Sequence, residues 1–229
     1  MMDISVVNLF NGLGPEELKA VSELAHERKF EKGETLFLEG DSPENVWFIL
    51  EGEVKVFKEY PSGKSAIMGI YGKGETIAIV AVIDGKKYPA SCQAVVKGRA
   101  AVMRRQDAMR CITANPPVAL EVMIDLSNRL RTMTAHLGSM SVQSVVKRLS
   151  TFLLRMAGQI GVKKGKATHV ELFLTRKELA ECIGTSFEVA VRCLGKLKDE
   201  GVMDIDGKKL VIYDMKKLER IAEKDGKEE

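Results

Sequence analysis

The stretch TRKELAECIGTS, residues 175–186, decides how the C-terminal part of this chain folds. Its first residue, Thr175, is followed three positions later by Glu178, and this capping-box spacing marks the start of a helix. Gly184 predicts the end of that helix, and Thr185 and Ser186 are good N-caps for a second one. A helix, a glycine turn and another helix together form the helix-turn-helix pattern.

The residues after the second helix predict a β-hairpin. Asp206-Gly207 separates two runs of strand-forming residues, which is a strong signal for a tight hairpin turn. A hairpin directly after a recognition helix is a wing, and the lysines beside its tip suit a phosphate backbone. The candidate DNA contacts are Thr175, Arg176, Thr185, Ser186, Phe187, Glu188, Arg192, Lys196, Lys208 and Lys209. A helical domain that binds only proteins stays open as the alternative.

The first part of the chain predicts a barrel or roll of short strands. Strand-forming runs such as 46–50 recur up to Met103, and turn signals at 61–63, 72–74 and 84–85 separate them. We expect a short helix, Pro15 to Glu27, ahead of the strands.

The hydrophobic period changes after residue 115, where prolines open a long helix. Apolar residues then recur in steps of four and three, which is the seam of a coiled coil. The residues of this stripe are Ala119, Met123, Leu126, Leu130, Met133, Leu137 and Met140. The last six are predicted to form the interface with an identical helix. The alternative is a helix packed on its own β-domain. The two interpretations are compatible if only part of the helix extends beyond the roll.

The predicted fold is therefore α+β, with a β-roll over 1–114, a dimerisation helix over 115–141 and a winged helix-turn-helix over 142–229. In the last part, an amphipathic helix over 142–159 and a basic loop over 161–166 precede the capping box.

Composition narrows the class of protein. The formal net charge is +3, but the residues from 146 onward carry 18 Lys and Arg against 14 Asp and Glu, a net +4. This asymmetry hints at a polyanionic partner. Neither a membrane-spanning apolar run nor a signal peptide is evident, so we expect a cytoplasmic protein without a membrane partner. We find no nucleophile–base pairing, metal spacing or phosphate loop, so an enzyme is not expected.

Four stretches, 32–37, 48–54, 148–154 and 174–180, resemble the family of the cyclic-AMP receptor protein and the fumarate–nitrate reduction regulator (Crp/Fnr). This resemblance covers nearly the whole chain. It implies a cyclic-nucleotide-binding-type β-roll, a homodimer, double-stranded DNA with a near-palindromic operator, and RNA polymerase as a further partner. A regulatory module that acts through a protein partner without reading DNA is the alternative.

The recognition helix departs from the family's usual pattern at one position. Glu188 and Arg192 match that pattern, whereas Phe187 replaces an arginine. Glutamate can accept a hydrogen bond from cytosine, arginine can bind guanine, and phenylalanine can only contact an apolar group such as a thymine methyl. We therefore expect a half-site that differs from the family's best-known one.

The effector segment departs further. Relatives that bind cyclic nucleotide carry Gly-Glu where this chain has Ala78-Ile79, and Arg-Ser or Arg-Thr where it has Tyr88-Pro89. The anchors for the ribose and the cyclic phosphate are thus absent, and the resemblance implies an apolar pocket and an effector other than cyclic AMP. The predicted pocket residues are Ile79, Val80, Tyr88, Pro89, Met133 and Thr134.

Haem, an aromatic ligand and a haem-bound gas stay open as effectors. Haem needs an axial ligand such as histidine, and the three candidates are His26, His136 and His169. An iron–sulfur cluster of the fumarate–nitrate type needs N-terminal cysteines, and no cysteine precedes Cys92, so this cofactor is not expected.

Overall fold

The computed structural model describes residues 2–223, without the side chains of residues 136 and 140–142. The chain forms two compact units, Met1–Arg131 and Thr132–Glu229. The division falls inside one long helix, and the predicted boundaries near residues 114 and 141 stay predictions.

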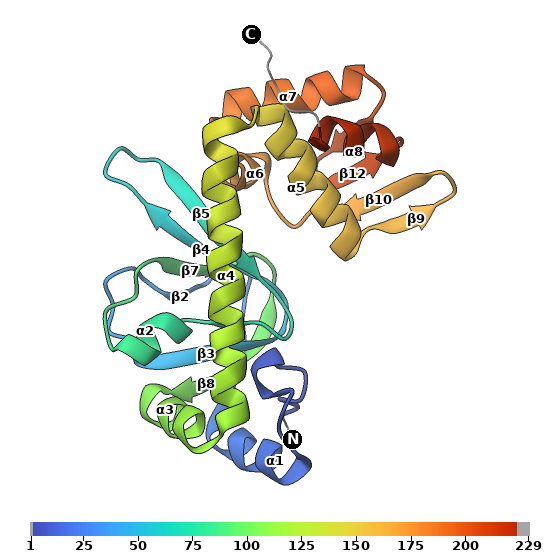
Figure 1. The fold of residues 1–229 in the computed structure, drawn as a ribbon. Coiled ribbons are helices and arrows are strands. Elements are labelled where there is room, and N and C mark those ends of the chain that lie inside the picture. The colour runs from blue at the N-terminus through green and yellow to red at the C-terminus, as the bar shows by residue number, and fades with distance from the viewer. Residues whose placement is uncertain (1, 224–229) are drawn as a thin grey trace. The chain divides into compact units, whose positions relative to one another are not determined.

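The first unit is a β-roll with helices at both ends of its sequence (Figure 1). Its elements are η1 (Asn8–Phe10), α1 (Pro15–Glu23), β1 (Ala25–Phe30), β2 (Thr35–Phe37), β3 (Asn45–Glu51), β4 (Val54–Glu59), β5 (Ser65–Tyr71), β6 (Thr76–Ile77), α2 (Ile79–Asp84), β7 (Ser91–Ala94), β8 (Gly98–Arg104), α3 (Arg105–Ala114) and α4 (Pro116–Val142). The strands form two four-stranded sheets in the orders β1-β8-β3-β6 and β2-β7-β4-β5.

Strand β3 shows why the two sheets pack as a roll. Its side chains alternate between two clusters, so that Phe48 joins one and Trp47 and Ile49 join the other. Successive residues of a strand point to opposite faces of the sheet. The sheet is therefore buried on both faces, one against helices and the other against the second sheet, which explains the continuous apolar run 46–50.

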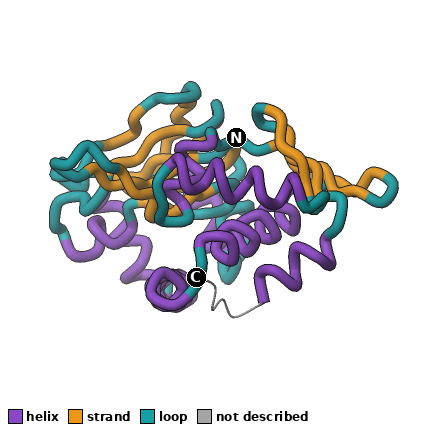
Figure 2. The backbone as a smooth tube through the Cα atoms, turned by 90° about the horizontal axis from the view of Figure 1, so that it is seen from above, coloured by secondary structure: helices purple, strands orange, loops and turns teal. Residues whose placement is uncertain are grey.

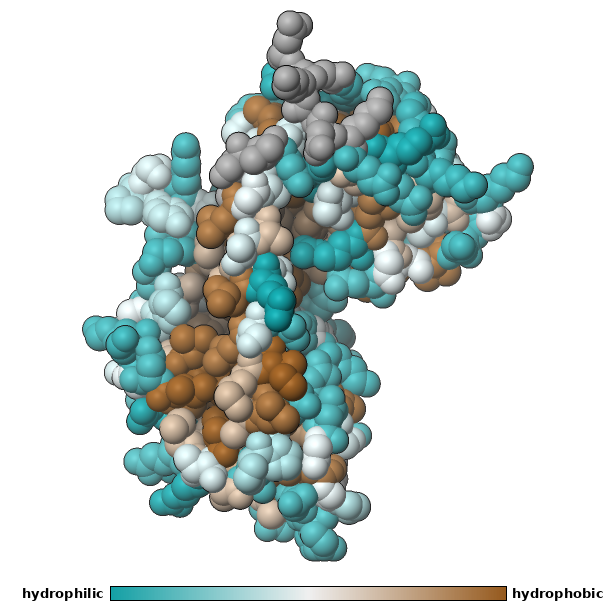
Figure 3. Space-filling view, in the orientation of Figure 1, coloured by the Kyte–Doolittle hydropathy of each residue, from teal (hydrophilic) through white to brown (hydrophobic). Residues whose placement is uncertain are grey.

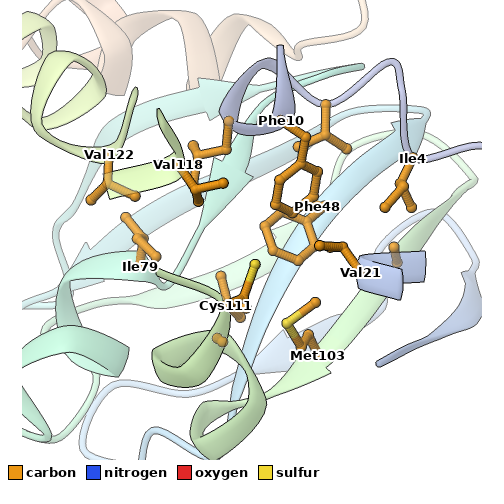
Figure 4. Close-up of a cluster of buried hydrophobic side chains, with 14 of the residues drawn as sticks. Ile4, Phe10, Val21, Phe48, Ile79, Met103, Cys111, Val118 and Val122 are labelled. Atoms are coloured by element: carbon orange, nitrogen blue, oxygen red, sulfur yellow. The ribbon is translucent and has the colours of Figure 1, made fainter. Parts of the chain in front are cut away.

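The helix-side cluster joins segments that are far apart in sequence (Figure 4). Phe10 of η1 and Phe48 of β3 have ring centroids 5.0 Å apart in a tilted arrangement. Val118 and Val122 of α4 pack into the same cluster. The start of α4 is thus part of the core of its own β-roll.

The predicted helix Pro15 to Glu27 is wrong at its C-terminal end. Helix α1 ends at Glu23, and the chain enters β1, where Glu27 pairs with Ala101 of β8. The residues after Glu23 favour a helix locally, but their backbone groups form hydrogen bonds with β8 instead.

The second unit contains the end of α4, then α5 (Val145–Ile160), β9 (Val162–Lys164), β10 (Ala167–Glu171), α6 (Arg176–Cys182), α7 (Phe187–Asp199), β11 (Met203–Asp206), β12 (Lys209–Ile212) and α8 (Met215–Glu223). Its sheet has the order β11-β12-β10-β9. The basic segment 161–166, expected to be a loop, instead forms part of the β9–β10 hairpin, which projects from this unit (Figures 1 and 2).

None of the described helices combines the length and apolar composition that a membrane crossing demands.

Candidate DNA-binding surface and β-roll interior

Helix α6 begins and ends as its sequence predicts. The Thr175 side chain accepts a hydrogen bond from the Glu178 backbone N–H at 3.2 Å, and the Glu178 carboxylate accepts from the Thr175 N–H at 2.9 Å. At the other end, Gly184 adopts a φ of 65°, a left-handed conformation that glycine takes without steric cost. These two features fix both limits of the first helix of the helix-turn-helix.

Helix α7 presents a polar face to solvent. The Ser186 side chain caps it by accepting from the Val189 N–H at 3.4 Å. Its inner face is buried through Ala190, Cys193, Leu194 and Leu197. On the outer face, Phe187, Glu188, Arg192 and Lys196 are exposed, whereas Thr185 in the preceding turn is half-buried. The spacing of four residues places Glu188, Arg192 and Lys196 one above another along the helix.

The surroundings of the Glu188 carboxylate favour its ionised form, which accepts hydrogen bonds. Its pKa lies below the ordinary value because its own backbone N–H and the Ser186 hydroxyl donate hydrogen bonds to it. An ionised carboxylate has only acceptors to offer. It therefore matches the exocyclic amino group of cytosine in the major groove.

The predicted wing is present, and side chains of α6 and α7 hold it. Strands β11 and β12 pair from Met203 with Ile212 to Asp206 with Lys209. Lys198 of α7 forms an ion pair with Asp204 at 2.7 Å, and Arg176 of α6 donates to the Ile205 carbonyl at 3.4 Å. The wing is thus fixed against both helices of the helix-turn-helix.

The two wing lysines differ in their surroundings. The Lys208 ammonium donates to the Phe173 carbonyl at 3.3 Å and is half-buried, whereas Lys209 is exposed. Both were predicted as phosphate contacts on the basis of position alone. The structure shows that the Lys208 side chain supports the wing, and that Lys209 is the one directed to solvent.

Helix α4 carries a long exposed apolar face (Figure 3). Met123, Leu130 and Leu137 are 57%, 67% and 68% exposed. Met133, Leu120 and Ile124 are exposed as well. The Met140 side chain lies outside the described residues.

Leu126 differs from the other described residues of the predicted interface. It is half-buried and packs against the core cluster of the first unit, together with Val122. The side of α4 that carries Val118, Val122 and Leu126 thus packs on the β-roll of its own chain. The exposed positions recur instead at Leu120, Met123, Ser127, Leu130, Thr134 and Leu137, with steps of three and four.

The interior of the β-roll is filled by aromatic and aliphatic side chains. Tyr88 is buried and stacks on Phe37, with ring centroids 4.2 Å apart and an interplanar angle of 28°. Its hydroxyl donates to the Asn45 carbonyl at 2.9 Å. Tyr88 is therefore held between two strands as a core residue.

The four predicted pocket residues of the first unit, Ile79, Val80, Tyr88 and Pro89, do not share one environment. Ile79 belongs to the helix-side cluster, Tyr88 belongs to the roll interior, and Val80 and Pro89 are exposed. The resemblance to the family supplied this set, whereas on α2 the successive side chains of Ile79 and Val80 point in different directions. Met133 and Thr134 are exposed on α4.

Ala78 occupies a strained position at the start of α2. Its φ is 69°, in the left-handed region that costs an ordinary residue about 1–2 kcal/mol. Ala78 is the only non-glycine residue with positive φ among the described residues. The left-handed turn that opens α2 is thus made by a residue that carries a methyl group.

Arg129 connects α4 to the β-roll, a contact that the sequence pattern did not reveal. Its guanidinium forms an ion pair with Asp125 at 2.8 Å, donates to the Thr76 carbonyl and lies 4.8 Å from the centroid of the Tyr71 ring. Asp125 and Arg129 are four residues apart on the helix, which is the one signal in the sequence that could have found the pair.

Glu53, the residue before β4, lies in the same unit with one carboxylate oxygen buried and without a hydrogen-bond partner among the described residues. Burial raises its pKa to about 7, and the nearby negative charge of Glu75 adds to the shift.

The candidate haem ligands show no arrangement that singles one out. His26 is exposed and His169 is half-buried, and the side chain of His136 lies outside the described residues. Within residues 2–223, no group of three or more His, Cys, Asp and Glu side chains could hold a metal ion.

Comparison with known proteins agrees with this architecture. The cyclic nucleotide-binding domain model matches residues 27–115, and the Crp-like helix-turn-helix domain model matches residues 147–221. The chain is 28% identical over 215 residues to the "Cyclic AMP receptor protein" of Thermus thermophilus, covering 93% of this chain and 96% of that protein.

Two further proteins are similar to this chain over most of their length. The "CRP-like cAMP-activated global transcriptional regulator" of Mycobacterium tuberculosis is 26% identical over 214 residues, which is 93% of this chain and 96% of that protein. In a solved structure, the c-di-GMP responsive global regulator CLP of Xanthomonas campestris has a TM-score of 0.78 at 20% identity and covers 87% of this chain and 99% of its own.

The fold and the helix-turn-helix surface define a DNA-binding transcription regulator, not an enzyme. The chain belongs to the Crp/Fnr family of such regulators. This confirms the predicted fold class and the predicted family.

Proposed function

We propose that this regulator acts as a homodimer on a near-palindromic operator, under the control of an effector other than cyclic AMP. The observation that carries the proposal is the exposed row of Glu188, Arg192 and Lys196 beside a fixed wing. A regulatory module that works without reading DNA would not need this surface.

The exposed face of α4 supports the dimer. Large apolar side chains that stay exposed over several helical turns favour association with a partner. Leu130 and Leu137 are seven residues apart and about two-thirds exposed, which matches one position of a coiled-coil heptad. The seam that we propose contains Leu120, Met123, Ser127, Leu130, Thr134 and Leu137, with Met133 beside it.

The proposed reading of DNA follows from the chemistry of α7. In a dimer, two recognition helices enter successive major grooves about 34–36 Å apart, which requires a two-fold related operator. Glu188 suits cytosine, Arg192 suits guanine, and the exposed Phe187 suits a thymine methyl. Thr175, Arg176, Lys196 and Lys209 are proposed to contact the phosphates.

The proposal about the effector rests on the two replaced anchors. The two relatives are named for cyclic AMP. The resemblance in sequence implies that Ile79 and Tyr88 stand where family members that bind cyclic nucleotide carry glutamate and arginine. Both side chains are buried in the cores of the first unit. Ile79 has no polar group for a ribose hydroxyl, and the Tyr88 hydroxyl offers no positive charge for a cyclic phosphate and already donates to the Asn45 carbonyl. An apolar molecule or a haem-bound gas suits these surroundings better.

We infer a cytoplasmic location and RNA polymerase as a further partner from the class of regulator.

Two measurements test the proposal. Selection from random duplex DNA should yield a near-palindrome, and recovery of no motif would contradict the DNA-reading part. Calorimetric titration with cyclic AMP should give no binding in the micromolar range. Trp47 is the only tryptophan in the chain and lies in the roll interior, so its fluorescence provides a second readout for any molecule that enters the roll. Micromolar binding with a change in Trp47 emission would refute the effector proposal.

A further inference from the structure

Arg148 of α5 binds three backbone carbonyl groups with three different nitrogen atoms. Its Nε donates to the Ile183 carbonyl at 2.9 Å and its Nη2 to the Gly184 carbonyl at 3.3 Å. Its Nη1 donates to the Gln143 carbonyl at 2.8 Å. The first two carbonyls belong to the turn of the helix-turn-helix, and the third belongs to the junction between α4 and α5.

The end of α6 explains why the turn needs this side chain. The Gly184 N–H bonds to the Glu181 carbonyl and the Thr185 N–H bonds to the Ala180 carbonyl, which is the Schellman arrangement. This arrangement satisfies two of the last carbonyls of the helix. The carbonyls of Ile183 and Gly184 come after these two, and Arg148 supplies donors to both.

The charge of Arg148 also suits this place. The C-terminal end of a helix carries a partial negative charge, and α6 ends directly at the guanidinium. Burial raises the pKa of the Cys193 thiol on α7, and the positive charges of Arg192, Lys196 and Arg148 oppose this shift. Arg148 thus lies where α5, the turn and α7 meet.

The junction between α4 and α5 is short. Helix α4 ends at Val142, and Ser144 already caps α5 by accepting from the Lys147 N–H at 3.3 Å. Only Gln143 lies between, and its carbonyl is the one that Arg148 binds. A rotation of α5 about this junction would therefore change the geometry of the Arg148–Gln143 bond while Arg148 remains tied to the turn.

We propose that Arg148 is a positioning residue that couples the α4–α5 junction to the start of the recognition helix. The inference rests on the proposed reading of DNA by α7. Arg148 does not contact DNA; it sets the position of Gly184 and the residues after it, and thereby the position of the Ser186 cap of α7. A lysine keeps the charge, but its single nitrogen cannot reproduce the planar fork that serves three acceptors.

The test uses the full-length protein and two variants of Arg148, with Arg155→Lys as the matched control. Arg155 is exposed on the same helix, seven residues further along. Binding is measured by fluorescence anisotropy at several salt concentrations. One duplex carries the operator selected by the wild-type protein, and the other is a scrambled duplex of equal composition.

We expect Arg148→Lys to weaken binding to the operator about tenfold, equivalent to about 1.4 kcal/mol, and to leave binding to the scrambled duplex unchanged. We expect Arg148→Gln to weaken operator binding as well, without a change in the salt slope. Loss of a direct phosphate contact would instead lower that slope by about 0.9 and weaken both duplexes alike. Such a result, or unchanged operator binding by Arg148→Lys, would overturn the proposal.

Amide hydrogen exchange separates positioning from loss of folding. The amides of Gly184 and Thr185 should exchange faster in Arg148→Lys than in Arg155→Lys, while the amides of the α5 interior stay protected. Equal exchange of the turn in both variants would contradict the proposal even if Arg148→Gln did not fold. A wild-type protein that selects no operator would contradict the proposed function, and the exchange experiment would still report on Arg148.

Discussion

The free energy of unfolding of the β-roll should decrease as the pH rises, and replacement of Glu53 by glutamine should abolish this decrease. One oxygen of the Glu53 carboxylate is buried without a hydrogen-bond partner among the described residues, and its pKa is raised to about 7 from 4.5. Burial is the main cause, because a charged carboxylate loses its hydration there. Glutamine has nearly the same shape and carries no charge at any pH.

The direction of the effect follows from proton binding. Between the unfolded and the folded pKa, the folded state holds a proton that the unfolded state has lost, so stability falls as the pH rises through this range. Below this pH range the stabilising contribution of the protonated Glu53 carboxyl is fully present, and above the range this contribution is completely lost. The full shift corresponds to about 3 kcal/mol. Because Glu53 is only half-buried, solvent screening reduces this to about 1–2 kcal/mol.

Urea unfolding followed by Trp47 fluorescence reports on the correct unit, because this single tryptophan lies in the roll interior. Glu53→Gln should match the wild type near pH 5 and exceed its free energy of unfolding by about 1–2 kcal/mol near pH 8. Glu59→Gln, at the exposed end of β4, is the control. If the variant and the wild type keep the same pH dependence, Glu53 does not hold a proton in the folded protein and the reasoning fails.

Four further predictions concern the dimer, the operator, the wing and the helix-turn-helix. Leu130→Glu combined with Leu137→Glu should give monomers in sedimentation equilibrium; a double variant that stays dimeric would place the interface elsewhere. Arg192→Ala should lose preference at one base pair per half-site, worth about 1–3 kcal/mol, in selection from random DNA. Lys209→Ala should weaken binding to all sequences and reduce the salt slope, and a changed motif in this variant would contradict the assignment. Thr175→Ala should lower the free energy of unfolding of the second unit by about 1 kcal/mol, measured by urea unfolding followed by circular dichroism.

The sequence alone determined the helix-turn-helix and its wing, because the signals for these elements are local. A capping box, a glycine with positive φ and an Asp-Gly turn each act within a few residues, and each was found where it was predicted. The apolar run 46–50 likewise predicted a strand. Fold class followed from these elements and their order.

The tertiary structure decided those features that depend on contacts between segments distant in sequence. The heptad pattern of α4 could not show that Leu126 packs on its own β-roll while Leu130 is exposed, since both lie on stripes of similar hydrophobicity. Tyr88 became a core residue because Phe37, about fifty positions earlier, supplies the ring on which it stacks. Arg148 binds carbonyls 35 and 36 residues away, and no local pattern encodes a contact between segments so far apart. These positions depend on long-range packing, which the sequence specifies only through the complete fold.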